Sequence, residues 1–356
     1  MKTTEILAVW PTTPKPTAAQ VTGFIQWLGG KGRDWKLPPI VRSVPASIGP
    51  PPAYAGLGDH SNYEASHALR QRLIYVTSNE GLIHAFDARG GNEVWAFMPP
   101  HLMPAAYDLY INGGQSEDPR EFKYVMASSP RVEDVKIGTQ WRTLLVQNDG
   151  PGGEDFVALD ISDMPSCTDA VPPTCTSPTS DAKPKVLFSS RYASPIIDGN
   201  LGETWSVPAV YWTGSLAPRV SMGTGYPGSA TDDNQYYNFF SLLTRPWSTD
   251  GSGTPAEYAT SKHDHASGSA SVDFATLADT VAVVDPTNLN EVKVTYQADL
   301  LGRIWAYDLG NAGTVRKIIN LTHKEPIHFS PAAVYQEATG RVMLAFATGA
   351  KTANER

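Results

Sequence analysis

The sequence predicts an all-β fold, a β-propeller made of four-stranded blades with long inserted loops. The same order of strands and turns recurs along the chain at intervals of roughly 40–80 residues, which is typical of a propeller. The 356 residues also include 30 glycines and 29 prolines, and such an excess is typical of many short strands joined by tight turns. A two-sheet sandwich is the alternative, but it gives no reason for one four-strand order to repeat.

One helix is predicted ahead of the repeats. Thr17 and Gln20 form a capping-box pattern, and Gly29 follows the last apolar residue as a stop. Apolar residues recur between them at helical spacing: Val21, Phe24, Ile25 and Leu28. We therefore divide the chain into an N-terminal helix and linker at 1–38 and a propeller domain at 39–356.

Each repeated unit has a second strand opened by a basic residue and a glycine-containing turn into a third strand. Most units begin with a Ser-Pro signal: Ser43 with Pro45, Ser129 with Pro130, Ser206 with Pro208, and Ser330 with Pro331. The second strands are expected at 72–76, 142–146, 219–222, 293–296 and 341–346. The third strands are expected at 82–87, 156–160, 239–242 and 303–308, with fourth strands at 93–97 and 185–188.

The best internal match aligns the segment from Tyr75 to Asp87 with the segment from Tyr296 to Asp308 without a gap. Gly81 and Gly302 fall at the same place in this repeat, where a hairpin needs a positive φ. Asp87 and Asp308 end equivalent strands, where a carboxylate can accept turn N–H groups. We therefore expect all four residues to be structural.

The fifth unit ends early, after its second strand and Thr348-Gly349. Because a propeller needs closure to remove its sheet edges, we expect either that the natural chain continues or that the N-terminal segment completes a blade. A truncated or processed chain is the favoured interpretation. The long inserts are expected at 98–124, 162–184 and 226–271.

Composition excludes several classes of function. The net charge is −8 and no cluster of Lys and Arg is present, which argues against nucleic-acid and anionic-membrane partners. No apolar run reaches the roughly 20 residues of a membrane span, and no signal-peptide pattern follows Met1. No G-x-S-x-G, H-E-x-x-H or phosphate-loop motif occurs, so no catalytic residues are assigned.

The chain has two cysteines, Cys167 and Cys175, both in a stretch rich in Ser, Thr and Pro. Their spacing allows a small disulfide loop if the compartment is oxidising. Two free thiols and a metal site are the alternatives.

Five runs in fixed order carry a family resemblance. They are 33–45, 72–99, 141–160, 204–206 and 297–309. Together they resemble the C-terminal domain of the PilY-type proteins of bacterial type IV pili. The resemblance implies a non-enzymatic pilus biogenesis factor and tip-associated adhesin that supports assembly with minor pilins, opposes retraction and attaches to a host or abiotic surface. It also implies an extracellular location, at the pilus tip or outer cell surface, after passage through the periplasm.

The family often carries an EF-hand-like calcium loop just before the last of these runs. The residues at that place that could bind calcium are Asp285, Asn288, Asn290 and Glu291. Leu289 and Lys293 stand where such a loop needs oxygen ligands, and Pro286 favours a plain hairpin turn. Calcium is therefore the one possible cofactor, and both interpretations stay open.

Other polar clusters could be functional sites, but each also has a purely structural interpretation. Two are His263-Asp264-His265 and the set Asp59, His60, Glu64 and His67, for which solvated loops are the better interpretation. A third is Asn148, Asp149, Glu154 and Asp155, which could hold a hard cation or form a polar hairpin loop. His84 and Trp305 occupy equivalent strand positions, which favours packing.

Two competing functions remain. A quinoprotein dehydrogenase has propeller repeats like the segment from Gly81 to Trp95, but here only the first unit has a Trp after the Asp. The other units have Phe188 or Ile318 there, which argues against that class. A generic cell-surface scaffold is the other alternative.

Overall fold

The computed structural model describes residues 3–53, 59–116, 118–166, 183–189, 202–213, 217–223, 225, 236–241, 257–262, 276–285, 288–309, 314–323 and 325–349. Statements about the structure below concern these residues.

The strands of the described chain form five antiparallel sheets, in which neighbouring strands follow one another in sequence. The first sheet holds β1 (Ala46–Ile48), β2 (Leu73–Ser78), β3 (Leu82–Asp87) and β4 (Glu93–Phe97). The second holds β5 (Arg131–Ile137), β6 (Gln140–Asn148), β7 (Phe156–Asp160) and β8 (Lys185–Ser189). The third holds β9 (Ala209–Thr213), β10 (Ala217–Met222), β11 (Tyr236–Ser241) and β12 (Glu257–Lys262). The fourth holds β13 (Val281–Asp285), β14 (Asn288–Ala298), β15 (Arg303–Asp308) and β16 (Thr314–Asn320), and the fifth holds β17 (Ala332–Gln336) and β18 (Arg341–Ala345).

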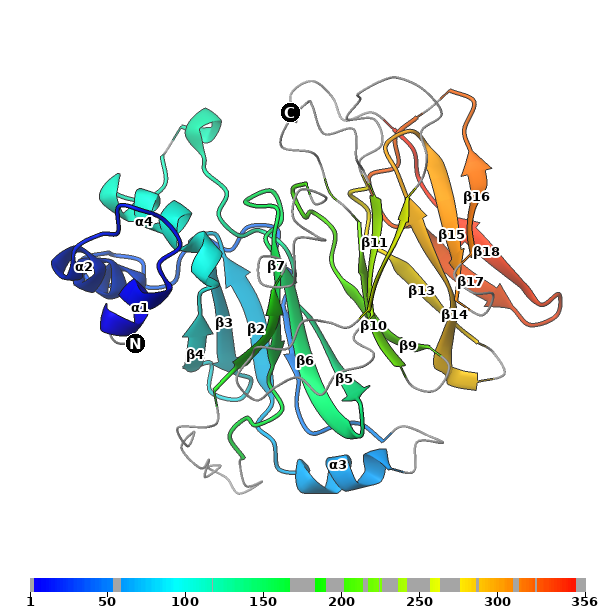
Figure 1. The fold of residues 1–356 in the computed structure, drawn as a ribbon, viewed down its shortest axis with the longest axis horizontal. Helices are drawn as coiled ribbons and strands as arrows, with labels where there is room; N and C mark the ends of the chain where they lie inside the picture. Colours follow the sequence, from blue (N-terminus) through cyan, green and yellow to red (C-terminus); the bar gives the residue numbers. More distant parts are fainter. Residues whose placement is uncertain are drawn as a thin grey trace.

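The sheets stand side by side in chain order, with the first and fifth at opposite ends of the row (Figure 1). A first strand takes part in each contact between neighbouring sheets: β1 meets β5, β5 meets β9 and β10, β9 meets β13 and β14, and β13 meets β17. This arrangement of four-stranded meanders confirms the predicted all-β propeller with five units and an incomplete last one. The described residues form no closed ring.

The internal repeat is visible in the strand registers. Tyr75 pairs with Ala85 in the first sheet, and Tyr296 pairs with Ala306 in the fourth. Strands β3, β7 and β15 begin and end at the predicted residues. Gly81 and Gly302 have φ of 85° and 71°, a conformation that glycine adopts without a steric penalty.

The Ser-Pro signals have a structural explanation. The hydroxyl of Ser43 accepts a hydrogen bond from the Thr77 N–H at 3.0 Å, and that of Ser206 accepts one from the Gly223 N–H at 2.9 Å. Both serines therefore join the entry of a first strand to the second strand of the same sheet. Ser129 instead accepts from the Val44 N–H at 2.9 Å, which links the first and second sheets.

The predicted helix is confirmed as α2 (Ala18–Leu28), with both halves of the capping box formed by Thr17 and Gln20. The prediction of a single helix is wrong, because three more α-helices and two short 3₁₀ helices are present. They are α1 (Thr3–Val9), α3 (His60–Ser66), η1 (Pro100–Leu102), α4 (Met103–Ile111) and η2 (Pro119–Glu121). Each is at most nine residues long, so tertiary packing stabilises it more than its own helix propensity does. No helix in the described ranges is long and apolar enough to cross a membrane.

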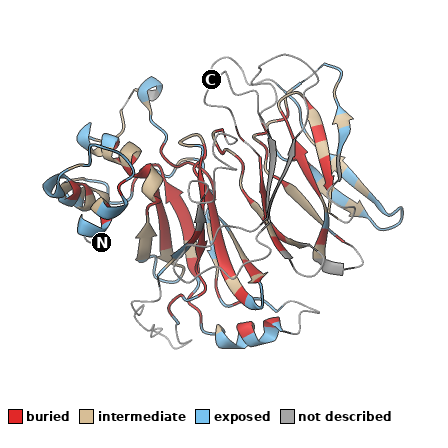
Figure 2. Cartoon of the chain, viewed as in Figure 1, coloured by how far each residue is buried: buried red, intermediate tan, exposed pale blue. Residues whose placement is uncertain are grey.

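The largest hydrophobic cluster joins the N-terminal helices to the first sheet. Ile6, Trp10 and Phe24 pack with Leu73 and Tyr75 in one buried group. Buried residues concentrate in the two middle strands of the first and second sheets, β2, β3, β6 and β7 (Figure 2). In the fifth sheet, by contrast, every second residue of β17 and β18 is exposed.

Candidate functional site

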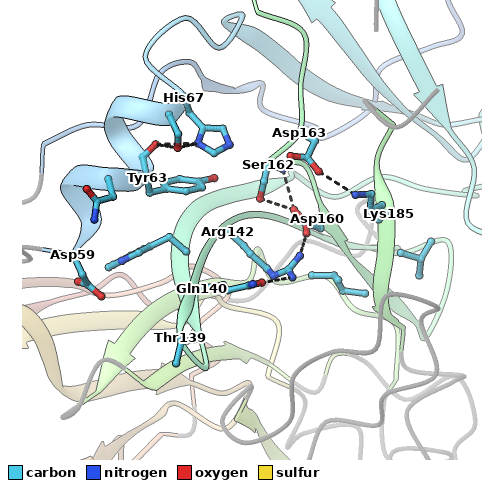
Figure 3. A pocket seen from close by; sticks show the side chains of 15 residues that line it. Asp59, Tyr63, His67, Thr139, Gln140, Arg142, Asp160, Ser162, Asp163 and Lys185 are labelled. Atoms are coloured by element: carbon cyan, nitrogen blue, oxygen red, sulfur yellow. Dashed lines mark hydrogen bonds and ion pairs between the residues drawn. The ribbon is translucent and has the colours of Figure 1, made fainter. Parts of the chain in front are cut away.

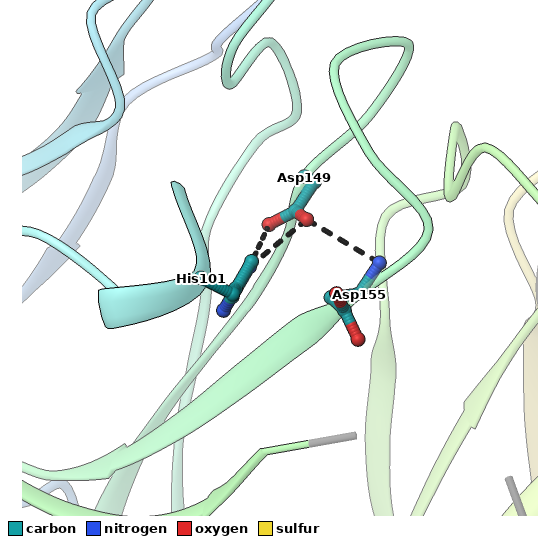
Figure 4. A group of neighbouring side chains, drawn as sticks. All are labelled: His101, Asp149 and Asp155. Carbon is teal, nitrogen blue, oxygen red and sulfur yellow. Dashed lines mark hydrogen bonds and ion pairs between the residues drawn. The ribbon is translucent and has the colours of Figure 1, made fainter. Parts of the chain in front are cut away.

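The first candidate site gathers three side chains from separate elements. His101 lies in η1, Asp149 follows the last residue of β6, and Asp155 precedes β7 (Figure 4). Each offers one ligand atom, and these atoms all lie within 4.8 Å of one another. We call this group the His–Asp–Asp cluster.

The cluster is closed to solvent and strongly polar. The His101 Nε2 lies 3.0 Å from each of the Asp149 carboxylate oxygens. The Asp155 N–H donates to the same carboxylate at 3.3 Å. Side-chain exposure is 5% for His101 and 1% for Asp149. Burial raises the pKa of the Asp149 carboxyl, although the nearby His101 favours its charged form.

Thr204 fixes the loop that carries the two carboxylates. Its hydroxyl accepts from the N–H groups of Asp149 and Gly150 at 3.1 and 3.3 Å and donates to the Asp155 carbonyl at 3.0 Å. Glycines let this loop lie close to the segment that leads into the second sheet. A Cβ at Gly150 would lie 2.8 Å from the Ala127 carbonyl, and Gly150 has φ of 75°.

The sequence predicted part of this cluster. Asp149 and Asp155, two of the four oxygen donors considered as a cation cage, do come together. Asn148 instead donates to the Ser206 carbonyl at 2.7 Å, and Glu154 is exposed. His101 was missed, because it lies in an insert 48 residues before Asp149 and no local pattern connects the two.

The second candidate site is a groove of about 630 Å³ between α3 and the second sheet (Figure 3). Ion pairs border it: Lys185 meets Asp163 at 3.0 Å, and Arg142 meets Asp160. The His67 ring lies 2.9 Å from the Ser66 hydroxyl. The volume of the groove lies within the usual range for small-ligand sites. The mixed charges of its lining select no single class of ligand.

Beneath this groove, a buried network ties α3 to the second sheet. Arg70 donates from Nη1 to the Thr143 hydroxyl at 2.5 Å and from Nε to the Gly49 carbonyl at 2.7 Å. The Tyr63 and Thr143 hydroxyls lie 2.7 Å apart, and Thr143 donates to the Asp134 carboxylate. Arg70 and Asp134 are 3% and 1% exposed.

The predicted solvated loop around Asp59, His60, Glu64 and His67 is therefore wrong. The segment from His60 to Ser66 is a helix, and His60 is 1% exposed. Its ring packs edge-on against Trp141 with centroids 4.5 Å apart. Burial lowers the pKa of His60, although Asp134 nearby favours its charged form. The four residues do not converge on one site, because Asp59 pairs with Lys136 at the surface.

The stretch that resembles a calcium loop joins two paired strands. Asp285 pairs with Asn288 across the turn, and its buried carboxylate forms an ion pair with Lys293. Glu291 is half-buried on β14. The side chains of Asn288 and Asn290 lie outside the described residues, so calcium binding here stays a prediction. Cys167, Cys175 and His263-Asp264-His265 also lie outside them.

The repeat residues contact their own hairpins. The Asp87 carboxylate accepts from the Gly90 N–H at 2.8 Å and from the Gln71 amide at 3.0 Å. Asp308 lies 3.9 Å from the Arg316 guanidinium. His84 and Trp305 also contact residues at equivalent positions of the repeat, Ser78 and Asp299. His84 Nε2 lies 2.9 Å from the Ser78 hydroxyl, and Trp305 Nε1 donates to the Asp299 carboxylate at 2.9 Å.

The fold defines the class of protein as a propeller-type domain of several four-stranded blades. No family model matches the chain. The fold matches the crystal structure of the Pseudomonas aeruginosa PilY1 C-terminal domain with a TM-score of 0.58 and 18% identity, over 87% of this chain and 61% of that domain.

Sequence comparison points to the same relatives. The chain is 28% identical over 333 residues to a type IV pilus biogenesis factor PilY1 homolog of Xylella fastidiosa, which covers 87% of this chain and 23% of that protein. It is 29% identical over 211 residues to PilY1 of Pseudomonas aeruginosa strain UCBPP-PA14, over 57% of this chain and 16% of that protein. The resemblance to a PilY-type C-terminal domain is confirmed, and the chain spans less than a quarter of the length of these relatives.

Proposed function

We propose that this chain belongs to a type IV pilus biogenesis factor. The observation that carries the proposal is the similarity to the Xylella fastidiosa PilY1 homolog, which extends over 87% of the chain. The fold match to the PilY1 C-terminal domain also covers 87% of the chain, so each comparison extends over most of it.

Within that role, we propose that the domain works by binding rather than by catalysis. It would sit at the pilus tip or outer cell surface, contact minor pilins during assembly and attach the pilus to a host or abiotic surface. A row of rigid sheets with long inserts suits this role, because recognition residues usually lie on loops held by a rigid scaffold. The described insert from 98 to 124, with η1, α4 and η2, is one such segment.

Deletion of the gene that encodes the chain tests the proposal. We expect fewer surface pili and reduced twitching, both restored by a tagged wild-type copy. Pili sheared from the complemented strain should carry the tag at one end when imaged with gold-labelled antibody. Normal piliation in the deletion strain, or label along the shaft, would contradict the proposal.

A pair of variants tests whether the folded domain itself is required. Leu144→Asp places a charge at a fully buried position of the second sheet, and we expect it not to restore piliation. Leu69→Asp, at a position 52% exposed, is the matched control and should restore it. Equal complementation by both variants would show that this domain is dispensable for piliation.

A further inference from the structure

We propose that the His–Asp–Asp cluster binds a divalent first-row transition metal ion such as zinc. The ion would join His101, at the start of the insert from 98 to 124, to the hairpin between β6 and β7. This inference does not depend on a role in pilus biogenesis.

The spacing of the ligand atoms suits a common ion. Zinc lies about 2.0–2.2 Å from imidazole nitrogen and carboxylate oxygen. Two such ligands at the tetrahedral angle of a zinc site are about 3.4 Å apart, so the 3.0 Å between His101 Nε2 and each oxygen of Asp149 lengthens by only a few tenths of an ångström when the ion binds. The Asp155 carboxylate lies within 4.8 Å of both partners.

The fourth sheet provides an internal comparison. Asp299 occupies the position equivalent to Asp149, at the end of a second strand. There the Asp299 carboxylate pairs with Arg303, a residue of the same hairpin that is always positively charged. Arg303 Nε donates to the carboxylate at 2.6 Å, and Trp305 Nε1 donates to it at 2.9 Å. At Asp149 an imidazole and a second carboxylate take these places. The second sheet therefore has side chains that can bind a metal ion where the fourth sheet has an arginine.

Electrostatics favour a cation at this place. Asp149 and Asp155 are 1% and 9% exposed, so two carboxylates lie close together away from solvent. A divalent ion between two buried carboxylates removes the repulsion between them and keeps both ionised. A single imidazolium adds one positive charge, whereas the ion adds two.

The donor set also selects the kind of metal. Calcium and magnesium prefer sites built from oxygen ligands alone, whereas imidazole suits zinc and its first-row neighbours. The site is therefore distinct from the calcium loop considered at 285–291, which offers only oxygen donors.

The loop holds the carboxylates in place before any ion arrives. Thr204 bonds both ends of the loop, and a Cβ at Gly153 would collide with the Asp149 carboxylate. Such preorganisation lowers the entropic cost of binding. We therefore expect the ion to fix the insert against the second sheet.

Equilibrium dialysis of the metal-stripped 356-residue chain tests the proposal, with zinc as the probe and calcium as the comparison. We expect one zinc ion per chain at this site, a rise in Tm with zinc, and no such rise with calcium. Asp149→Asn and Asp155→Asn should each weaken zinc binding by at least ~10-fold. Asp155→Asn is the milder change and keeps the test valid if Asp149→Asn does not fold.

Matched controls separate this site from other histidines. Glu93→Gln removes the carboxylate from the pair in which His84 Nδ1 lies 2.6 Å from Glu93, and it should leave zinc binding unchanged. The double variant His263→Ala, His265→Ala should also keep the ion. Absence of zinc binding in the wild-type chain, or wild-type affinity in both Asp variants, would overturn the proposal.

Discussion

At the scale of single residues, backbone packing around the His–Asp–Asp cluster depends on glycine. A Cβ added at Gly152 would collide with the Val125 carbonyl group. We expect Gly152→Ala to lower the free energy of unfolding by about 1–3 kcal/mol, because the loop or the segment around Val125 must shift. Urea unfolding followed by tryptophan fluorescence measures the change.

The control is Gly349→Ala, because nothing lies within 4 Å of the position of its Cβ. It should change stability by less than about 0.5 kcal/mol. An equal loss in both variants would show that the close approach at Gly152 has no energetic weight.

His84 is the residue whose burial predicts a pH dependence. It is 3% exposed, and burial lowers its pKa although Glu93 nearby favours the charged form; Lys36 lines the same small cavity. The folded state therefore resists protonation, while the unfolded imidazole titrates near ~6.5. The stability that neutral His84 contributes is present above that value and is lost as pH falls through the lowered pKa.

Unfolding midpoints measured between neutral and mildly acidic pH test this expectation. His84→Gln should show a shallower loss of stability on acidification than the wild type. His323→Gln, at an exposed position, controls for the removal of one imidazole. A wild-type slope in His84→Gln would contradict the expectation.

The sequence revealed residues whose role is local. Gly81 and Asp87 act within one hairpin, so their repeated spacing marked them before the fold was known. Asp149 and Asp155 are close in the chain and were considered together. His101 and Arg70 act across 48 and 73 residues, and a single sequence does not show which distant residues meet.

At the scale of elements, the buried network under α3 should hold that helix in place. Arg70→Met leaves the Asp134 carboxylate buried without its cation, and we expect a loss of about 3–5 kcal/mol in the free energy of unfolding. The double variant Arg70→Met, Asp134→Leu should recover part of that loss, because no buried charge then remains.

Lys136→Met is the control for this prediction. It breaks the pair with Asp59, which is 47% exposed, and should cost at most about 1 kcal/mol. Thermal unfolding of all three variants measures the ranking. A single variant at Arg70 that is no less stable than the Lys136 variant would contradict the assigned role of the network.

Strands and helices differed in how well the sequence predicted them. Strands β3, β7 and β15 were predicted at their true bounds because a mainly apolar run follows a glycine-containing turn and ends at an Asp in each. The helix α3 has only His60 and Tyr63 buried, which leaves no apolar period to detect. In α4 the pattern of Met103, Ala106 and Leu109 was present but was interpreted as part of an insert.

At the scale of the whole molecule, the core is uneven from one end to the other. The first two sheets share a large buried cluster with α1 and α2. Toward the other end the described cluster is smaller, and Val334 and Met343 in the fifth sheet are 62% and 59% exposed. Because local stability follows buried apolar contact, the sheets should open at different free energies.

Hydrogen exchange followed by mass spectrometry on the 356-residue chain tests this gradient. We expect amides of β2, β3, β6 and β7 to exchange slowly, through opening with nearly the full free energy of unfolding. Amides of β17 and β18 should exchange much faster at the same pH, because their sheet has two strands and packs on one face. The Leu144→Asp variant should accelerate exchange in β6 and β7 and leave β17 and β18 unchanged, since the two regions belong to separate clusters. Uniform protection across the sheets, or equal acceleration everywhere in that variant, would show that the five sheets unfold as one cooperative unit.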